Sequence, residues 1–236
     1  MTIYRLFEDP LFPDPEEADP DGLLAVGGDL APERLLAAYG SGIFPWYSEQ
    51  SPILWWSPDP RLVLEPERLH VPRSLRRVLN SGRFRFSLDQ DFAAVIRACA
   101  CTPRPGQHGT WIVPEMVAAY EALHALGHAH SAECWRDDRL VGGLYGVSIG
   151  SVFFGESMFF AEPDASKALF AALVQWLAAT GCTLIDCQQT TPHLLRFGAR
   201  EITRKEFLKR LAKGLNAPNL GPRWDFGTGG DAQSLQ

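Results

Sequence analysis

The 236-residue chain contains no C-x-x-C pair, and its six histidines show no spacing typical of metal ligands. Its five cysteines are odd in number, and three lie in apolar segments where a thiol packs as a small hydrophobic group. We therefore expect no disulfide framework and no metal site. The first residues lack a basic segment followed by an apolar stretch, and no uncharged run approaches the roughly 18 to 20 residues that span a bilayer. These absences predict a cytoplasmic, unexported protein that does not cross a membrane.

Positive charge is scarce overall, with a net charge of -6 and a pI of about 5.5. Such a balance disfavours a nucleic-acid partner, because phosphate binding requires basic side chains. The charges are nevertheless uneven: residues 1–60 carry two basic and eleven acidic side chains, whereas 61–104 carry nine basic and four acidic. Residues 196–213 add seven basic against two acidic. A solvated helix face explains either basic segment alone, but the two together predict a local phosphate-binding surface.

The chain shows no internal repeat and no low-complexity linker. Residues 1–61 are rich in proline and turn formers, with one short helical pattern at 32–39, and we expect them to form a small N-terminal α/β domain. Residues 62–236 then form a second domain. Glycines at 227, 229 and 230 predict a flexible tail over about 224–236.

The second domain has more regular patterns. Three strand-like segments at 129–135, 140–147 and 151–159 are separated by turn-sized connections, which predicts an antiparallel meander. A helix with Asp164 as its N-cap follows and stops at Gly181, and a strand occupies 183–188. Basic and amphipathic patterns predict further helices at 69–80 and 114–126. The fold class is therefore α+β, with helices covering a mostly antiparallel sheet.

Asp186 and Gln188 are the sharpest local signal for chemistry, because they end an apolar strand. Strand alternation places both on one face and Ile185 and Cys187 on the other. A carboxylate beside an amide can hold an ammonium group and manage its proton. The residues alone favour a second interpretation, in which Asp186 caps a turn or pairs with a lysine or arginine.

Glu156 lies in an otherwise apolar strand, so its carboxylate is either paired in a salt bridge or serves a cationic ligand. Alternation puts Phe153 on the opposite face, and both line one pocket only if a bulge interrupts the strand. Tryptophans near basic segments are candidates for stacking on bases, although most tryptophans are packing residues. Trp46 and Trp111 lie in irregular stretches and fit the ligand role better than Trp55 and Trp56.

Motifs spread over nearly the whole chain resemble those of the leucyl/phenylalanyl-tRNA protein transferase family. The larger domain of that family is similar to the N-acetyltransferase (GNAT-type) fold. The segments that carry the resemblance are 22–30, 42–46, 53–61, 109–112, 127–131, 140–147, 155–159, 164–167 and 186–188.

The resemblance implies transfer of Leu, Phe or less often Met from aminoacyl-tRNA to proteins with N-terminal Arg or Lys, which marks them for degradation. It implies a monomer that needs no cofactor and no metal. Asp186 would act on the α-ammonium group, Gln188 would orient the nucleophile, and Glu156 would face the acceptor's cationic end. The remaining implied site residues are Trp46 and Trp111 for the terminal adenosine, Leu144, Phe153, Met158, Leu177 and Tyr120 at the donor pocket, and Arg73, Arg76, Arg77 and Arg83 for tRNA phosphates.

Two departures from the family pattern are Phe160-Ala161, where Ser-Arg is expected, and Thr203, where proline is usual. Two rival functions also stand. An acetyl-CoA-dependent N-acetyltransferase needs a pyrophosphate loop of the form R/Q-x-x-G-x-G/A, which the sheet-forming region does not contain. A non-catalytic RNA-binding adaptor needs only the basic segments and the tryptophans.

Overall fold

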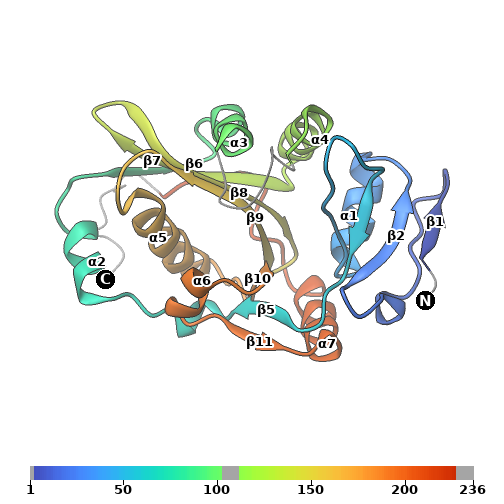
Figure 1. Cartoon of the computed structure of the whole chain (residues 1–236). Coiled ribbons are helices and arrows are strands. Elements are labelled where there is room, and N and C mark those ends of the chain that lie inside the picture. Colours follow the sequence, from blue (N-terminus) through green and yellow to red (C-terminus); the bar gives the residue numbers. More distant parts are fainter. Residues whose placement is uncertain (1–2, 103–111, 227–236) are drawn as a thin grey trace.

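The N-terminal part of the chain forms a small sheet of its own. The computed structural model describes residues 3–102 and 112–226. The small sheet has the strand order β1-β2-β4-β3, and only its β1–β2 pair is parallel. Together with α1 it makes up the blue region of Figure 1. Its elements are β1 (Tyr4–Leu6), β2 (Leu23–Gly27), α1 (Pro32–Gly40), β3 (Phe44–Pro45) and β4 (Leu54–Trp56), with a 3-10 turn at Pro15–Glu17.

A seven-stranded sheet forms the centre of the molecule, in the order β11-β5-β10-β9-β8-β7-β6. Every neighbouring pair is antiparallel except β9 and β10, which run parallel. The predicted α+β class and the meander of three consecutive strands are therefore confirmed. The strands are β5 (Arg61–Leu64), β6 (Arg85–Leu88), β7 (Ala129–Arg136), β8 (Arg139–Ile149), β9 (Val152–Phe160), β10 (Leu184–Gln188) and β11 (Arg200–Ile202).

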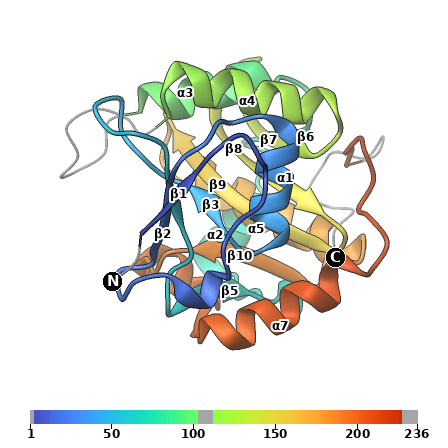
Figure 2. The same ribbon diagram turned by 90° about the vertical axis from the view of Figure 1, so that its right-hand side faces the viewer.

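Helices cover both faces of this sheet, because its strands bury side chains on each side. Helices α3 and α4 pack on one face, and α5 packs on the other (Figure 1 and Figure 2). Two clusters of buried apolar residues result, one on each face. No helix within residues 3–102 and 112–226 combines the length and apolarity needed to cross a membrane. The helices are α2 (Arg73–Leu79), α3 (Phe92–Cys101), α4 (Pro114–Ala125), α5 (Ala165–Ala179), α6 (Pro192–Arg196) and α7 (Arg204–Leu215), with a 3-10 turn at Pro66–Arg68.

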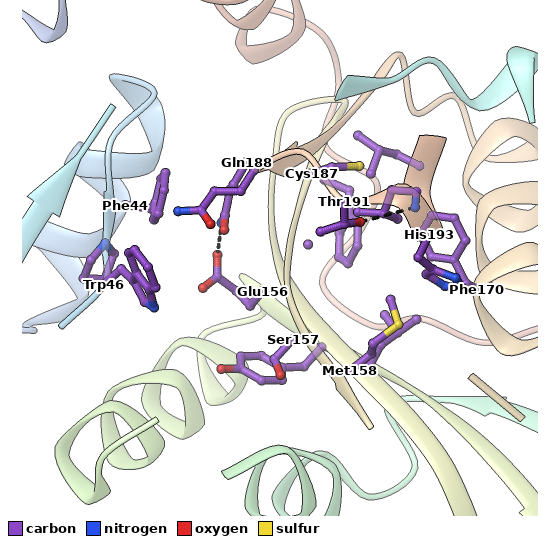
Figure 3. A pocket seen from close by; sticks show the side chains of 18 residues that line it. Phe44, Trp46, Glu156, Ser157, Met158, Phe170, Cys187, Gln188, Thr191 and His193 are labelled. Carbon is purple, nitrogen blue, oxygen red and sulfur yellow. Dashed lines mark hydrogen bonds between the residues drawn. The ribbon is translucent and has the colours of Figure 1, made fainter. Parts of the chain in front are cut away.

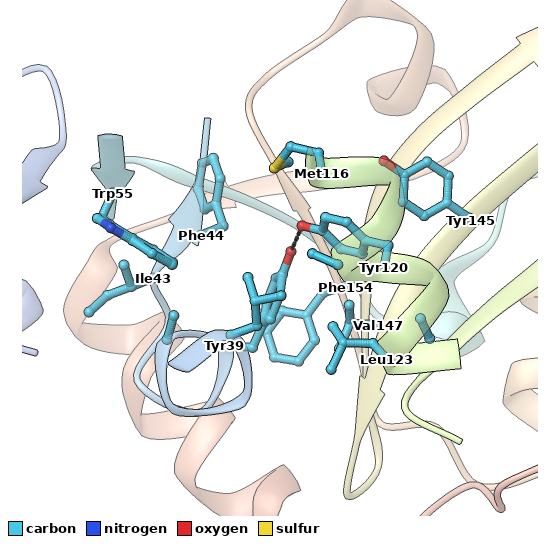
Figure 4. Packing of buried hydrophobic residues seen from close by; sticks show 14 of the residues in the cluster. Tyr39, Ile43, Phe44, Trp55, Met116, Tyr120, Leu123, Tyr145, Val147 and Phe154 are labelled. Atoms are coloured by element: carbon cyan, nitrogen blue, oxygen red, sulfur yellow. Dashed lines mark hydrogen bonds between the residues drawn. The ribbon is translucent and has the colours of Figure 1, made fainter. Parts of the chain in front are cut away.

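The N-terminal region is joined to the large sheet by aromatic packing. The ring of Tyr39 on α1 lies 5.1 Å from that of Phe154 on β9, and its hydroxyl is hydrogen-bonded to the hydroxyl of Tyr120 on α4 (Figure 4). All three side chains are buried in one cluster that also contains Trp55. This cluster crosses the division expected at residue 61, which stays a proposal.

Two predicted helix starts differ in detail from the structure. The helix expected over 69–80 begins at Arg73, because Pro72 disfavours helical backbone at the preceding Val71. Asp164 does precede α5, but its φ is 68° and its side chain makes no capping hydrogen bond. The Asp164 carboxylate instead pairs with Lys167 at 2.9 Å.

The start of the predicted flexible tail is ordered by packing, so that part of the prediction is wrong. Trp224 is buried, its ring stacks on His130 at 4.0 Å, and its backbone N–H donates to Asp89. Burial of the large aromatic surface of Trp224 stabilises this segment, although the glycine-rich composition that follows predicts flexibility. Residues 227–236 lie outside the described part of the chain.

Candidate active site

The candidate site opens where the two parallel strands of the large sheet part. β9 and β10 pair over only three positions, which join Leu184–Asp186 to Val152–Phe154. Beyond these positions each strand continues without the other. The backbone and side chains that follow Phe154 on β9 and Asp186 on β10 therefore face each other across a gap, and a pocket occupies it.

Both strands are irregular at this point. On β9 the register with β8 shifts so that Glu156 has no partner between Gly155 and Ser157, which is a bulge of one extra residue. The bulge brings Phe153 and Glu156 into the walls of one pocket. On β10 the register with β5 shifts between Asp186 and Gln188, and Gln188 has a φ of 61°.

The pocket has a volume of about 390 Å³, within the range of small-molecule sites. In Figure 3, Phe44, Trp46, Glu156 and Gln188 lie at one end and Met158, Phe170 and His193 at the other. The pocket therefore offers a polar end beside aromatic rings and a largely apolar end. The apolar lining comprises Leu144, Phe153, Met158, Phe170, Ile185, Cys187 and Leu194.

Glu156 is the ionisable group of the polar end. Burial raises its pKa to about 7, and hydrogen bonds from tyrosine hydroxyls and Gln188 oppose this rise. Tyr120 donates its hydroxyl to one carboxylate oxygen at 3.1 Å, and the Gln188 amide nitrogen donates to the other at 2.8 Å (Figure 3). Burial raises the pKa of Tyr39 and Tyr120 well above the ordinary value, so both phenols stay protonated donors. The salt bridge that would explain Glu156 as purely structural is not present among the described residues.

Asp186 does not line the pocket, so its predicted direct action on the substrate ammonium disagrees with the geometry. Its carboxylate is fully buried and accepts two hydrogen bonds from Arg61, from Nε at 2.9 Å and Nη2 at 2.7 Å. The register shift turns Gln188 to the same side as Ile185 and Cys187, and regular alternation fails for this reason. The Asp186 side chain instead agrees with the alternative interpretation, in which it pairs with an arginine.

Asp186 still supports the pocket, because its carboxylate binds the backbone of a residue that lines it. Its Oδ1 accepts a hydrogen bond from the backbone N–H of Gln188 at 2.9 Å. The guanidinium of Arg61 lies between the rings of Phe44 and Phe207, at 4.8 and 4.5 Å from their centroids. Since Phe44 and Gln188 both line the pocket, the buried ion pair supports two of its walls.

Cys187 lines the pocket and was not expected there. Burial, together with the neighbouring Asp186 charge, raises the pKa of the Cys187 thiol far above its usual range. A protonated thiol is a weak nucleophile, which disfavours a thioester intermediate on this residue. The geometry is better suited to direct attack of an amine on a bound ester.

The other predicted donor-site residues differ in where the structure places them. Trp46 lines the pocket and rests against Trp56 at 5.8 Å, whereas Trp111 lies outside the described residues. Tyr120 is buried behind Glu156 rather than in the wall. Leu177 is buried in the core and does not reach the pocket.

Phe170 takes the place expected for Leu177. The two side chains lie on one face of α5, but Leu177 is about two turns further along the helix. Sequence periodicity identifies which face of a helix is buried, but it does not identify which turn of that face lines a cavity. Other lining residues that the sequence did not single out are Phe44, from the N-terminal region, and Gln189, Thr191, His193 and Leu194, which directly follow β10 in the sequence.

The basic segments have different fates. Arg73, Arg76 and Arg77 are exposed on α2 and form no ion pair within the described residues. Arg83 pairs with Glu162 at 3.1 Å. Of the four arginines predicted to contact phosphates, the three on α2 are therefore available to bind a polyanion.

In the second basic segment, 196–213, three of the seven basic side chains bind other groups of the protein. Arg200 and Arg210 bond to Glu65, and the hydrogen bond from Arg200 is the main reason that the pKa of Glu65 is lowered to about 2. Arg204 is buried and donates to the carbonyl of Pro15. These three side chains are not available for phosphate, whereas Arg196, Lys205, Lys209 and Lys213 are exposed.

Sequence comparisons with family models and with known proteins agree on one family. A family model described as leucyl/phenylalanyl-tRNA protein transferase matches residues 63–212, and one described as its N-terminal domain matches residues 28–59. A leucyl/phenylalanyl-tRNA–protein transferase of Anaeromyxobacter sp. (strain Fw109-5) is 63% identical over 97% of both chains. One from Maridesulfovibrio salexigens is 58% identical over 96% of this chain and 95% of its own.

Among solved structures, a GCN5-related N-acetyltransferase from Kribbella flavida aligns with a TM-score of 0.35 and 13% identity. The alignment covers 70% of this chain and 58% of that one. The family matches, by contrast, cover the strands and helices that build the pocket described above. The chain therefore belongs to the leucyl/phenylalanyl-tRNA protein transferase family and is an aminoacyltransferase.

Proposed function

We propose that the chain transfers Leu, Phe and less often Met from aminoacyl-tRNA to the α-amino group of proteins with N-terminal Arg or Lys, which marks them for degradation. The observation that carries this proposal is the pocket between β9 and β10, which joins an apolar end to a carboxylate–amide pair. An apolar aminoacyl ester and a cationic amine are the two substrates that such a pocket fits.

The apolar end receives the donor side chain. Leu144, Phe153 and Met158 line it, together with Phe170, so an unbranched or γ-branched side chain is buried among apolar atoms. Discrimination by shape between side chains that differ by one methylene is worth about 1–3 kcal/mol. This value suits a site that accepts several apolar residues while disfavouring β-branched ones.

The polar end receives the acceptor amine. Glu156 takes a proton from the α-ammonium group, and Gln188, whose amide nitrogen is already held by Glu156, offers its carbonyl oxygen to the amine. The amine nitrogen then attacks the ester carbonyl, the new C–N bond forms, and the C–O bond to the ribose breaks. The ribose oxygen leaves as a hydroxyl, with the second proton that the attacking nitrogen gives up as it becomes the peptide nitrogen. Aminolysis of an ester is downhill, and positioning of amine and ester supplies much of the rate because it makes the attack effectively intramolecular.

Asp186 has a positioning role in this proposal. Its carboxylate holds the backbone of Gln188 in the left-handed conformation and anchors Arg61, which packs against Phe44. The buried pair of Asp186 and Arg61 thereby fixes the amide that meets the amine. A direct role as general base passes instead to Glu156, which lines the pocket and has a pKa of about 7.

The tRNA lies across the large sheet toward α2. The indole of Trp46 lies beside the polar end and stacks on the terminal adenosine, with Trp111 as its proposed partner. Arg73, Arg76 and Arg77 bind phosphates of the acceptor stem. We place the enzyme in the cytoplasm as a monomer, since aminoacyl-tRNA is available there and one chain supplies both the apolar and the polar end of the pocket.

The test is transfer itself. The purified chain is incubated with radiolabelled leucyl-tRNA and a peptide that begins with Arg, without added metal or CoA. Labelled peptide is expected, and none is expected from a matched peptide whose α-amino group is acetylated. Failure to label the first peptide, with retained binding of tRNA, would favour the non-catalytic adaptor.

A further inference from the structure

The segment that follows α7 returns to the large sheet and places Trp224 next to Phe153. The two side chains are buried in one apolar cluster, and their ring centroids lie 5.5 Å apart. Phe153 lines the pocket between β9 and β10, whereas Trp224 does not. The match to the family model ends at residue 212, so Trp224 belongs to a part of the chain that this match does not cover.

Trp224 is held from several sides. Its ring stacks on that of His130 at 4.0 Å with an interplanar angle of 1°, and it meets the ring of Trp176 on α5 at 4.8 Å. Its backbone N–H donates to Oδ2 of Asp89 at 3.1 Å, and Nδ1 of His130 lies 2.7 Å from the same oxygen. The indole N–H donates to the carbonyl of Gly221 at 3.2 Å. One carboxylate therefore binds both members of the stack, which fixes the indole beside the sheet.

Gly146 on β8 provides the space that the Phe153 ring occupies. A Cβ atom on residue 146 would lie 2.5 Å from Cζ and 2.8 Å from Cε2 of Phe153, so this ring lies directly over the backbone of Gly146. Gly146 is paired with His130 in the register of β7 and β8. The indole stacked on His130 thus lies beside the Phe153 ring on the same face of the sheet. Because protein interiors are close-packed, the indole opposes displacement of Phe153 away from the pocket.

We propose that Trp224 is a positioning residue that determines donor preference, because it holds Phe153 in the pocket wall and thereby fixes the size of the apolar end. The inference rests on the proposed function, because it assigns that end to the donor side chain. Without the indole, the Phe153 ring retreats toward the space that Trp224 occupied. The apolar end then becomes larger, which favours a Phe donor over a Leu donor.

The test measures donor choice in competition. Leucyl-tRNA and phenylalanyl-tRNA at equal concentrations are mixed with a peptide that begins with Arg, and the two labelled products are compared. Their ratio equals the ratio of kcat/KM for the two donors. Both donors compete for the same folded molecules, so the fraction of folded enzyme cancels and a destabilised variant still gives a valid ratio.

Three variants of the full chain are compared with the parent. Trp224→Leu keeps an apolar side chain in the core and removes the indole, whereas Trp224→Phe keeps an aromatic ring beside Phe153. The matched control is Leu177→Ala, which removes buried volume from the same cluster at a position that does not line the pocket. Thermal unfolding of each variant measures how much stability is lost.

We expect Trp224→Leu to raise the ratio of Phe to Leu transfer about tenfold, the low end of the effect that one methylene has in an apolar pocket. Trp224→Phe and Leu177→Ala should keep the ratio within about twofold of the parent, although the control unfolds at a lower temperature. Phe153→Leu should change the ratio by itself. Adding Trp224→Leu to it should then change the ratio by less than about twofold, because the indole acts through the Phe153 ring.

Four results would overturn the role of Trp224. An unchanged ratio in Trp224→Leu makes this residue a packing residue only. A shift toward Leu means that the Phe153 ring moves into the pocket and was not held in its wall. A similar shift in Leu177→Ala means that any loss of core packing alters donor choice. An equal effect of Trp224→Leu with and without Phe153→Leu means that the indole does not act through that ring.

The parent enzyme reports separately on the proposed function. If it transfers neither Leu nor Phe to the peptide, the proposed function fails, and the role of Trp224 falls with it. If the parent transfers both while the ratio in Trp224→Leu stays unchanged, the proposed function stands and only the role of Trp224 is refuted.

Discussion

Replacing Asp186 with asparagine leaves the guanidinium of Arg61 buried without its counterion. Asp186 and Arg61 are 0% and 1% exposed and are joined by two hydrogen bonds, so solvent cannot compensate for the loss. Removing one partner of a buried ion pair costs about 3–5 kcal/mol. For a chain of this length each kcal/mol lowers Tm by about 2–4 °C, which predicts a decrease of about 6–20 °C.

A compensating variant separates stability from chemistry. Asp186→Asn with Arg61→Met removes both charges, and the asparagine oxygen still accepts the hydrogen bond from the Gln188 N–H. The methionine side chain fills the space between Phe44 and Phe207 that the arginine occupies. Replacement of a buried ion pair by well-packed uncharged groups is often neutral, so most of the lost Tm should return.

Transfer kinetics then decide the role of Asp186. A positioning role predicts that the single variant loses transfer and that the double variant regains it to within about tenfold of the parent, measured well below both Tm values. A double variant that unfolds like the parent but transfers no better than the single one would show that the carboxylate itself reacts. A single variant with an unchanged Tm would refute the energetic reasoning.

Three further predictions concern the pocket and the tRNA. Glu156 has a folded pKa of about 7 against 4.5 when unperturbed, so the folded state binds an extra proton between these values and stability falls as pH rises through that window. Transfer rises over the same range as the carboxylate ionises; Glu156→Gln should flatten both profiles, and an unaltered kcat/KM profile would exclude Glu156 as the base. Arg76→Ala with Arg77→Ala should weaken tRNA binding and reduce its salt slope by about 1–2, whereas an unchanged slope would dismiss α2 as the tRNA contact. Met158→Ala should change kcat/KM for Leu and Phe donors unequally. Leu177→Ala should lower the free energy of unfolding by about 2–5 kcal/mol without changing the ratio of kcat/KM between the two donors. The opposite pattern would reverse our assignment of the two residues.

Local patterns predict the elements of this fold where neighbouring residues determine the structure. The meander of β7, β8 and β9 follows from alternating apolar residues and short turns, and α4 follows from Pro114 at its first turn. Helix α3 was not among the predicted elements, although Asp91 caps it and Phe92, Val95 and Ile96 repeat at helical spacing. That signal is present in the sequence and competes with the basic charge of the surrounding segment.

The candidate site is predicted less well because it depends on register. The faces of β9 and β10 are assigned by alternation, and alternation fails at the two positions that matter most, Glu156 and Gln188. A bulge arises from the pairing of two strands that are distant in sequence, so no window around either residue contains it. The same reasoning explains why Asp186 is recognised as special in the sequence while its partner Arg61, 125 residues away, is not.

The proton affinity of Glu156 links the small sheet to the chemistry of the large one. Burial raises the pKa of this carboxylate, and the hydrogen bonds that lower it come from Tyr39 on α1, Tyr120 on α4 and Gln188 on β10. Only the first of these belongs to the N-terminal region, and its position depends on the packing of its ring against Phe154. A pKa of about 7 is therefore a property of the docked arrangement, because loosening α1 removes a donor that favours the ionised form. The N-terminal region contributes in this way to the proton affinity of the proposed general base, and it also supplies Phe44 and Trp46 to the pocket wall.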